Sequence, residues 1–282
     1  MPPDAWVIQA PDITPATLRA LAEHVAARAI IPVGSGKPVA YRLPAATQQP
    51  ALHAAAAAVS CDAGFVPGVR RLDRVRVVAM DMDSTLITIE CIDEIADLHG
   101  IKADVAAITA SAMRGEIEFA ESLRRRVRLL AGLPEAALLR VYEERLRISP
   151  GAQRMITGFR AIGAKTLLVS GGFTFFTERL KTRLQLDHAH ANTLRVKDGI
   201  LTGEVEGAIV DAQVKADVVA AWKSKYAGSD GLVVTLGDGA NDLPMFAAAD
   251  VSIAYRAKPV VRAAATHTID HCGLDAALNY FS

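Results

Sequence analysis

The sequence predicts an α/β fold built on a parallel sheet, with a helical insertion and a small α+β unit in front of it. From residue 150 onward, apolar strand-like runs alternate with helical patterns, which is typical of a parallel sheet covered on both faces. The apolar run at residues 75–80 ends in two carboxylates, Asp81 and Asp83. Residues 90–147 carry almost no strand signal, so they interrupt the sheet as an insertion.

The composition narrows the class of protein. The chain has 282 residues, 51% of them hydrophobic, which suits a core domain with additions. Lys plus Arg and Asp plus Glu both number 31, so nothing indicates a nucleic-acid partner. Three widely spaced cysteines fit reduced thiols better than disulfides or a zinc site. We find no signal-peptide pattern and no membrane-spanning run, and therefore expect a cytoplasmic protein with no membrane partner; a homodimer stays open.

Residues 1–70 are predicted to form a separate small domain of helices on a sheet. The expected strands lie at 6–8, 39–43 and 61–66, and the expected helices at 14–27 and 51–59. The Gly-rich stretch 34–38 lacks the spacing of a phosphate-binding loop, so we expect a solvent loop there. No cluster of acids, histidines or cysteines marks this unit as a reaction centre. Residues 67–73 are expected to be a polar linker.

The predicted core consists of residues 71–88 and 148–282, and residues 89–147 form the insertion. The insertion shows helical spacing at 92–98, 103–114, 118–131 and from 134 onward, which makes it a candidate lid. The second part of the core is expected to alternate between helices at 153–162, 173–184 and 212–226 and strands at 166–169, 194–196, 200–203, 232–236, 251–254 and 268–269. An Asp-Gly turn at 198–199 predicts a hairpin.

Polar side chains follow three of the predicted core strands. Ligands of parallel sheets bind beyond the carboxyl ends of the strands, where Asp81, Ser170 and Asp238 are expected to converge. Neighbouring carboxylates repel one another unless a cation intervenes, and hard oxygen ligands suit Mg²⁺. With Asp81 and Asp238 on the metal, one oxygen of Asp81 stays free to attack phosphorus, giving an aspartyl-phosphate. Asp83 then protonates the leaving oxygen and activates water.

Other residues of the same loops suit a transferred phosphoryl group. Ser170 and the amides of Gly171 and Gly172 precede a helix and can donate hydrogen bonds to phosphate oxygens. Lys215 is either a further phosphate neighbour or a solvated lysine, and the pattern does not decide between them. Asn241 and Asp242 are either plain helix caps or an outer layer that orients the metal ligands.

The insertion adds two groups of opposite charge. At roughly 100° per residue, Arg126 falls on the apolar face of its helix together with Phe119. An arginine on that face needs an anion, and its planar fork matches a carboxylate, whereas Arg124 and Arg125 are expected to be solvated. Glu90 suits an ammonium group, although an ordinary acid in a first helical turn is the alternative. Together these groups describe an amino acid that bears a phosphate.

These residues resemble the motifs of the haloacid-dehalogenase-like phosphatases. Asp81-Met82-Asp83-Ser84-Thr85 is similar to the first motif and Ser170-Gly171-Gly172 to the second; Lys215 resembles the third and residues 237–242 the fourth. Within that superfamily, residues 72–282 resemble the bacterial phosphoserine phosphatases. The resemblance includes the spacings of Glu90, Met113-Arg114-Gly115, Phe119 and Arg126 from Asp81. It implies a Rossmann-like core with a helical-bundle cap, and an ACT-like domain at residues 1–70.

The resemblance also implies a role for each of these residues. Asp81 would be the nucleophile and Asp83 the proton donor, in Mg²⁺-dependent hydrolysis of O-phospho-L-serine, the last step of serine biosynthesis. The implied metal ligands are Asp81, the backbone carbonyl of Asp83, and Asp238, supported by Asp242. The implied substrate contacts are Glu90 to the ammonium, Arg126 to the carboxylate, Met113 and Phe119 in the lid, and Ser170, Gly171, Lys215 and Asn241 around the phosphate.

Three alternatives remain at this point. The substrate could be another small phosphomonoester, such as phosphohomoserine or phosphothreonine, because the core fixes only the chemistry. The aspartyl-phosphate could be passed to another alcohol, which would make the protein a phosphotransferase. A third alternative is a regulatory protein that senses an amino acid through residues 1–70. The intact set of Asp81, Asp83 and Asp238 argues against this last hypothesis.

Overall fold

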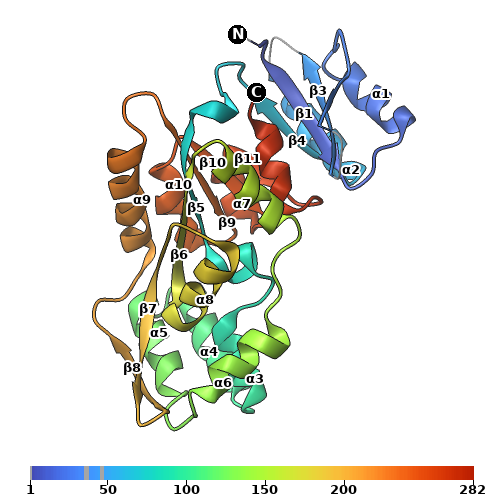
Figure 1. Ribbon diagram of the computed structural model, residues 1–282. Coiled ribbons are helices and arrows are strands. Elements are labelled where there is room, and N and C mark those ends of the chain that lie inside the picture. The colour runs from blue at the N-terminus through green and yellow to red at the C-terminus, as the bar shows by residue number, and fades with distance from the viewer. Residues whose placement is uncertain (1, 35–37, 45–47) are drawn as a thin grey trace.

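The computed structural model describes residues 2–34, 38–44 and 48–282, and contains two separate sheets (Figure 1). Residues 35–37 of the expected solvent loop lie outside the described residues. A four-stranded antiparallel sheet is formed by the N-terminal part of the chain, and a seven-stranded sheet by the rest. Across the described residues, no helix is both long and apolar enough to cross a membrane.

The N-terminal sheet has the order β2-β3-β1-β4. Its elements are β1 (Ala5–Ala10), α1 (Pro15–Glu23), β2 (Ile31–Val33), β3 (Val39–Pro44), α2 (Pro50–Ala58) and β4 (Asp62–Val66). This βαββαβ succession is that of ferredoxin-like units. The sequence predicted only three of the four strands, because β2 has three residues, one of them Pro32, and lies at an edge. Helix α1 ends at Glu23, whereas the sequence predicted a helix that extends to residue 27.

The N-terminal sheet packs its two faces differently. Trp6 and Ile8 of β1 pack with Leu52 of α2 in a buried apolar cluster under the helices. The opposite face meets the C-terminal part of the chain (Figure 1), where the Asp62 carboxylate accepts hydrogen bonds from the backbone N–H groups of residues 270–272. The side chain of Asn279 donates to Gln9 Oε1 across the same contact at 2.8 Å. The two sheets are therefore joined by specific polar contacts.

The large sheet has the order β11-β10-β9-β5-β6-β7-β8, with β8 alone antiparallel. Its strands are β5 (Val75–Met80), β6 (Lys165–Phe173), β7 (His188–Lys197), β8 (Ile200–Glu206), β9 (Leu232–Gly237), β10 (Val251–Tyr255) and β11 (His267–Ile269). The helices around it are α7 (Ala152–Ala161), α8 (Thr174–Leu184), α9 (Ala212–Tyr226), α10 (Leu243–Ala247) and α11 (Pro259–Ala264). Two separate apolar clusters, one with α7 and α8 and one with α9 and α10, cover its two faces. The predicted parallel α/β core is confirmed.

The segment between β5 and α7 is helical, as predicted. It consists of α3 (Cys91–Leu98), α4 (Lys102–Met113), α5 (Phe119–Arg128) and α6 (Ala136–Arg140), followed by the turn Val141–Arg145. Its two ends are joined, because the N–H of Thr88 donates to the carbonyl of Arg147 at 3.0 Å.

The β7–β8 hairpin reaches down beside the helical segment (Figure 1) and bonds to the chain after α5, with Gly132 N donating to Leu201 O at 2.9 Å. Asp198 and Gly199 at its tip both have positive φ, as the predicted Asp-Gly turn requires. Helix α5 is thus held against the large sheet.

Candidate active site

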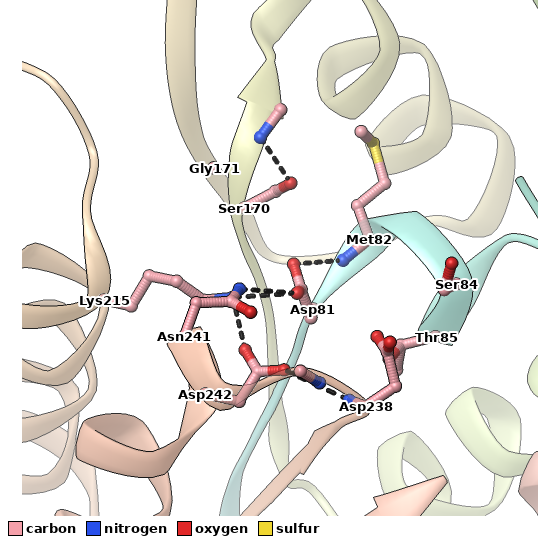
Figure 2. A network of polar contacts seen from close by, with 12 residues as sticks. Asp81, Met82, Ser84, Thr85, Ser170, Gly171, Lys215, Asp238, Asn241 and Asp242 are labelled. Atoms are coloured by element: carbon pink, nitrogen blue, oxygen red, sulfur yellow. Dashed lines mark hydrogen bonds and ion pairs between the residues drawn. The ribbon is translucent and has the colours of Figure 1, made fainter. Parts of the chain in front are cut away.

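The predicted convergence at the carboxyl ends of the strands is confirmed. Asp81 directly follows β5, Ser170 lies within β6, and Asp238 directly follows β9. Figure 2 shows the polar side chains of these segments gathered around Asp81. Carboxylate oxygens of Asp81, Asp238 and Asp242 lie within 4.8 Å of one another.

Asp81 is held by contacts from three directions. Its Oδ1 accepts the backbone N–H of Met82 at 2.7 Å, and its Oδ2 lies 3.0 Å from Lys215 Nζ and 3.4 Å from Asn241 Nδ2. The Asp81 side chain is 8% exposed. The carboxylate is consequently fixed in position, with little freedom to rotate.

Lys215 is a buried member of the site rather than a solvated lysine. Its side chain is 1% exposed and also lies 2.5 Å from Asp242 Oδ1. Burial alone would lower the pKa of Lys215, but the carboxylates of Asp81 and Asp242 outweigh it and raise that pKa above its ordinary value. The solvated alternative is therefore wrong, and a permanent positive charge stands beside Asp81.

Asp242 does more than cap a helix. Its Oδ2 accepts the N–H groups of Asp238 and Gly239, both at 3.1 Å, which fixes the loop that carries Asp238. Burial, followed by repulsion from Asp81, raises the pKa of Asp242 to about 7 and that of Asp238 to about 6. A Cβ at Gly237 would lie 2.3 Å from Asp242 Oδ2, so only glycine leaves room for this arrangement.

These three carboxylates suit a metal ion. They supply the hard oxygen donors that divalent cations such as Mg²⁺ or Mn²⁺ prefer. Burial and then repulsion from Asp81 raise the pKa values of Asp238 and Asp242, and a cation would relieve the repulsion. The cluster contains Asp242 and not the side chain of Asp83.

Asp83 lies beside the cluster in a different environment. Its Oδ1 accepts the N–H of Cys91, the first residue of α3, at 3.2 Å. Burial raises the pKa of Asp83 well above its ordinary value, and the nearby carboxylates of Glu90 and Asp81 raise it further. A Cβ at Gly172 would lie 2.8 Å from Asp83 Oδ2, so this glycine allows the acid to approach β6. The arrangement favours a protonated carboxyl group, as a proton donor requires.

The turn after Asp81 supplies two contacts that the sequence did not reveal. Ser84 adopts a left-handed φ of 55° and its Oγ donates to Glu90 Oε1 at 2.6 Å. Thr85 Oγ1 donates to Asp238 Oδ1 at 3.0 Å (Figure 2). A serine at positive φ is uncommon, and only the Asp-Ser-Thr run hinted at a tight turn. Both hydroxyls orient a predicted site carboxylate.

Ser170, Gly171 and Gly172 line the site opposite the acids. The Oγ of Ser170 accepts the N–H of Gly172 at 2.9 Å, and Ser170 is 1% exposed. Helix α8 begins at Thr174, two residues after Gly172. The structure therefore places the Ser170 hydroxyl and a helix N-terminus close to Asp83, an arrangement that suits an anion.

The helical segment brings Arg126 and Glu90 toward the acids. Among the described residues, the buried Nε of Arg126 has no hydrogen-bond partner. Burial lowers the pKa of Arg126, whereas Asp93, Glu90 and Asp83 raise it. Glu90 is exposed on the whole, yet loss of water around its carboxylate raises its pKa. Of these three acids, Asp93 has the largest effect on the pKa of Arg126. The sequence did not indicate a role for Asp93.

The remaining residues of the predicted lid differ in how exposed they are and in whether they contact the site. A Cβ at Gly171 would lie 3.1 Å from Phe119 Cζ, so the Phe119 ring already lies over Gly171. Met113, at the end of α4, is 70% exposed and has not closed over anything. Arg124 and Arg125 are exposed, as expected, and Arg125 pairs with Glu121 one turn away.

Comparisons with known proteins agree with this geometry. Residues 78–247 match the haloacid dehalogenase-like hydrolase family. A phosphoserine phosphatase from Polaromonas is 48% identical over 210 residues, covering 73% of this chain and 89% of that protein. The unliganded crystal structure of a probable phosphoserine phosphatase from Vibrio cholerae matches with a TM-score of 0.85 at 35% identity, over 98% of this chain and 85% of that one. A substrate-bound phosphoserine phosphatase structure has a TM-score of 0.67 at 37% identity, over 74% and 99% of the two chains.

Proposed function

Because the chain belongs to the phosphoserine phosphatases of the haloacid dehalogenase-like hydrolase family, we propose that it hydrolyses O-phospho-L-serine to L-serine and phosphate. It is then a phosphoric monoester hydrolase that completes serine biosynthesis. The observation that carries the choice of substrate is the buried Arg126 Nε near Glu90, for which the described part of the chain supplies no hydrogen-bond partner. This pair offers complementary charges for the carboxylate and the ammonium of an amino acid.

The reaction proceeds in two steps. An oxygen of Asp81 attacks phosphorus, the bond from phosphorus to the serine oxygen breaks, and the leaving oxygen takes the proton of Asp83. Asp83, now a carboxylate, removes a proton from water, whose oxygen attacks the aspartyl-phosphate and releases phosphate. Asp83 is thereby protonated again and Asp81 regenerated. The raised pKa of Asp83 supports its role as the initial proton donor.

Phosphate and metal contacts are assigned to the residues around Asp81. Ser170, the amide of Gly171, and the side chains of Lys215 and Asn241 bind the phosphoryl oxygens, whereas the Gly172 N–H donates to Ser170 Oγ and supports the site indirectly. Asp81, the backbone carbonyl of Asp83 and Asp238 would hold Mg²⁺, with Asp242 fixing the Asp238 loop. When bound, the ion would neutralise carboxylate and phosphate charge.

The assignment of the larger parts of the chain belongs to the same proposal. Residues 1–70 are an ACT-like domain, residues 71–88 and 148–282 the catalytic core, and residues 89–147 the cap. Met113 and Phe119 close the cap over the substrate. A cytoplasmic location is supported by the three free, buried cysteines, which suit a reducing compartment. A homodimer remains a hypothesis that sedimentation would test.

A substrate panel tests this function. The full chain is assayed with phosphoserine, phosphothreonine, phosphohomoserine and an aryl phosphate, each with Mg²⁺ and with chelator. We expect phosphoserine to have the highest kcat/KM and the chelator to abolish turnover. Equal rates on all four compounds would contradict the substrate assignment, and full activity in chelator would contradict the metal. Addition of free serine, with product analysis, separates hydrolysis from transfer to an alcohol.

A further inference from the structure

The Ser170-Gly171-Gly172 segment is a bulge in an otherwise regular strand pairing. Strands β6 and β7 pair Val169 with His190, and pair again at Phe173 with Asn192. Between these pairs β6 contains three residues and β7 only Ala191. Bulges leave backbone groups without ladder partners and are frequent beside active sites. Some other group must therefore hold the peptides of residues 170–172.

The side chain of Asn192 is that group. Its Nδ2 donates to the carbonyl of Gly171 at 2.8 Å, and its Oδ1 accepts the backbone N–H of Val210 at 2.8 Å. A carbonyl can only accept and a backbone N–H can only donate, so the orientation of this amide is unambiguous. Asn192 is 1% exposed. Both of its polar atoms are consequently used inside the protein.

This contact determines where Ser170 can donate its proton. The carbonyl of Gly171 and the N–H of Gly172 belong to one planar trans peptide and point in opposite directions. When Asn192 holds that carbonyl, the Gly172 N–H points away from it and donates to Ser170 Oγ at 2.9 Å. Ser170 then accepts one hydrogen bond and keeps its own O–H to donate to a phosphoryl oxygen. The chain of hydrogen bonds runs from Val210 through Asn192 and the peptide to Ser170.

The second hydrogen bond of Asn192 is made to Val210, just before the helix that carries Lys215. Val210 precedes Asp211, whose side chain caps α9 by accepting the N–H of Val214 at 2.9 Å. Lys215 lies in the first turn of that helix. Asn192 thus connects the two segments that carry Ser170 and Lys215, both of which would contact a phosphoryl group.

We propose that Asn192 is a positioning residue for phosphate binding, which sets the Gly171–Gly172 peptide and, through it, the hydroxyl of Ser170. The proposal rests on the proposed phosphatase function but does not depend on which phosphomonoester is the substrate. The probe is therefore inorganic phosphate, whose affinity for the Mg²⁺-loaded protein is measured by calorimetry. Failure of the wild-type chain to turn over phosphoserine would affect the proposed function and leave this measurement intact.

Two variants of Asn192 separate the effects of its two hydrogen bonds, and a third variant elsewhere in the chain serves as a matched control. Asn192→Asp can still accept from Val210 but cannot donate to Gly171, and Asn192→Ser is too short for either contact. We expect both to weaken phosphate binding about tenfold, the effect of one lost buried hydrogen bond. Asn279→Ser removes a comparable amide contact to Gln9, far from the site, and should leave phosphate affinity unchanged. A phosphate affinity of Asn192→Asp equal to that of the wild type would overturn the proposal. If the buried charge unfolds Asn192→Asp, a wild-type phosphate affinity of Asn192→Ser would overturn it instead.

A double-mutant cycle distinguishes positioning from general destabilisation. In a Ser170→Ala background there is no hydroxyl left to orient, so Asn192→Ser should weaken phosphate binding about twofold or less, instead of about tenfold. Mg²⁺ affinity, measured on the same variants without phosphate, should not change. Equal losses in the two backgrounds, or a loss of Mg²⁺ affinity that parallels the loss of phosphate affinity, would overturn the proposal, because Asn192 would then not act through the hydroxyl of Ser170.

Discussion

The two sides of the site differ in how their charged groups are satisfied before a substrate arrives. On the sheet side, Lys215 contacts both Asp81 and Asp242, and all three side chains are buried. On the helical side, the buried Nε of Arg126 finds no hydrogen-bond partner within residues 2–34, 38–44 and 48–282, and Glu90 is exposed with a hydroxyl as its partner.

The difference reflects what each side has to do. Groups that stabilise a reacting phosphoryl group work best when they are already in place, because no reorganisation is then needed during the reaction. Groups that select a substrate gain most when the substrate supplies the missing partner, because an analogue without it leaves them unpaired. Under the proposed function, the sheet side would provide the chemistry and the helical side the choice of substrate.

The largest effect is expected on the sheet side, at Asp81. Asp81→Asn keeps the shape of the side chain but removes the nucleophilic oxygen and one charge beside Lys215. We expect kcat to fall roughly 10⁴-fold or more for every phosphomonoester, since loss of a nucleophile costs about this much. Steady-state phosphate release with phosphoserine and with an aryl phosphate measures it. An effect confined to phosphoserine would mean that Asp81 recognises the substrate and does not attack it.

Replacement of Arg126 should weaken recognition of phosphoserine and leave the chemical step largely unaffected. Arg126→Ala loses a charge-assisted contact to the substrate carboxylate, and we expect kcat/KM for phosphoserine to fall about 10- to 100-fold. An aryl phosphate has no carboxylate, so its kcat/KM should change less than about threefold. Arg125→Ala is the matched control, because Arg125 is exposed and pairs with Glu121. Similar losses for both substrates in Arg126→Ala would place this arginine in the chemistry.

The pH dependence of stability should report the crowded carboxylates of the sheet side. The folded pKa values of Asp238, about 6, and Asp242, about 7, lie above the ordinary aspartate value. These two carboxyl groups therefore bind more protons in the folded protein than in the unfolded chain between about pH 4 and 7, and their contribution to stability falls as the pH rises through this range. Each group contributes at most about 1.4 kcal/mol per pH unit to the free energy of unfolding.

Urea unfolding of the chelator-treated chain between pH 4.5 and 7 measures this slope. Saturating Mg²⁺ should flatten it, because a cation lowers the pKa values of the carboxylates that it contacts. Asp238→Asn should reduce the slope without metal. A stability that rises with pH in chelator, with the same slope in Mg²⁺, would contradict the electrostatic account of the cluster.

The sequence predicted the parts of the site that depend on strand ends and helix faces. Asp81, Ser170 and Asp238 could be placed together because parallel strands present their carboxyl ends at one edge. Arg126 could be distinguished from its two neighbours because a helix has a fixed angular spacing. Both arguments use only regular geometry, which the sequence pattern specifies.

The contacts that escaped prediction depend on irregular backbone or on distant neighbours. Ser84 reaches Glu90 only because its φ is positive, and Asn192 is used only because β6 bulges. The parallel half of β7 was missed, since its His and Asn residues are weak strand signals. Lys215 was ambiguous, because its burial depends on carboxylates far away in the chain. Such features follow from tertiary packing, which a pattern in one segment does not contain.

The smallest effect is expected at Ser84, which links the two sides. Its hydroxyl donates to Glu90 from the turn that follows Asp81, so Ser84→Ala should leave Glu90 less well oriented. We expect KM for phosphoserine to rise about threefold, the effect of one modest hydrogen bond, with kcat nearly unchanged. Ser84→Gly removes the same hydroxyl but suits the positive φ of 55°, so it should raise KM equally and be more stable than Ser84→Ala by about 1 kcal/mol. A rise in KM for Ser84→Ala alone would show that backbone strain, and not the hydroxyl, positions Glu90.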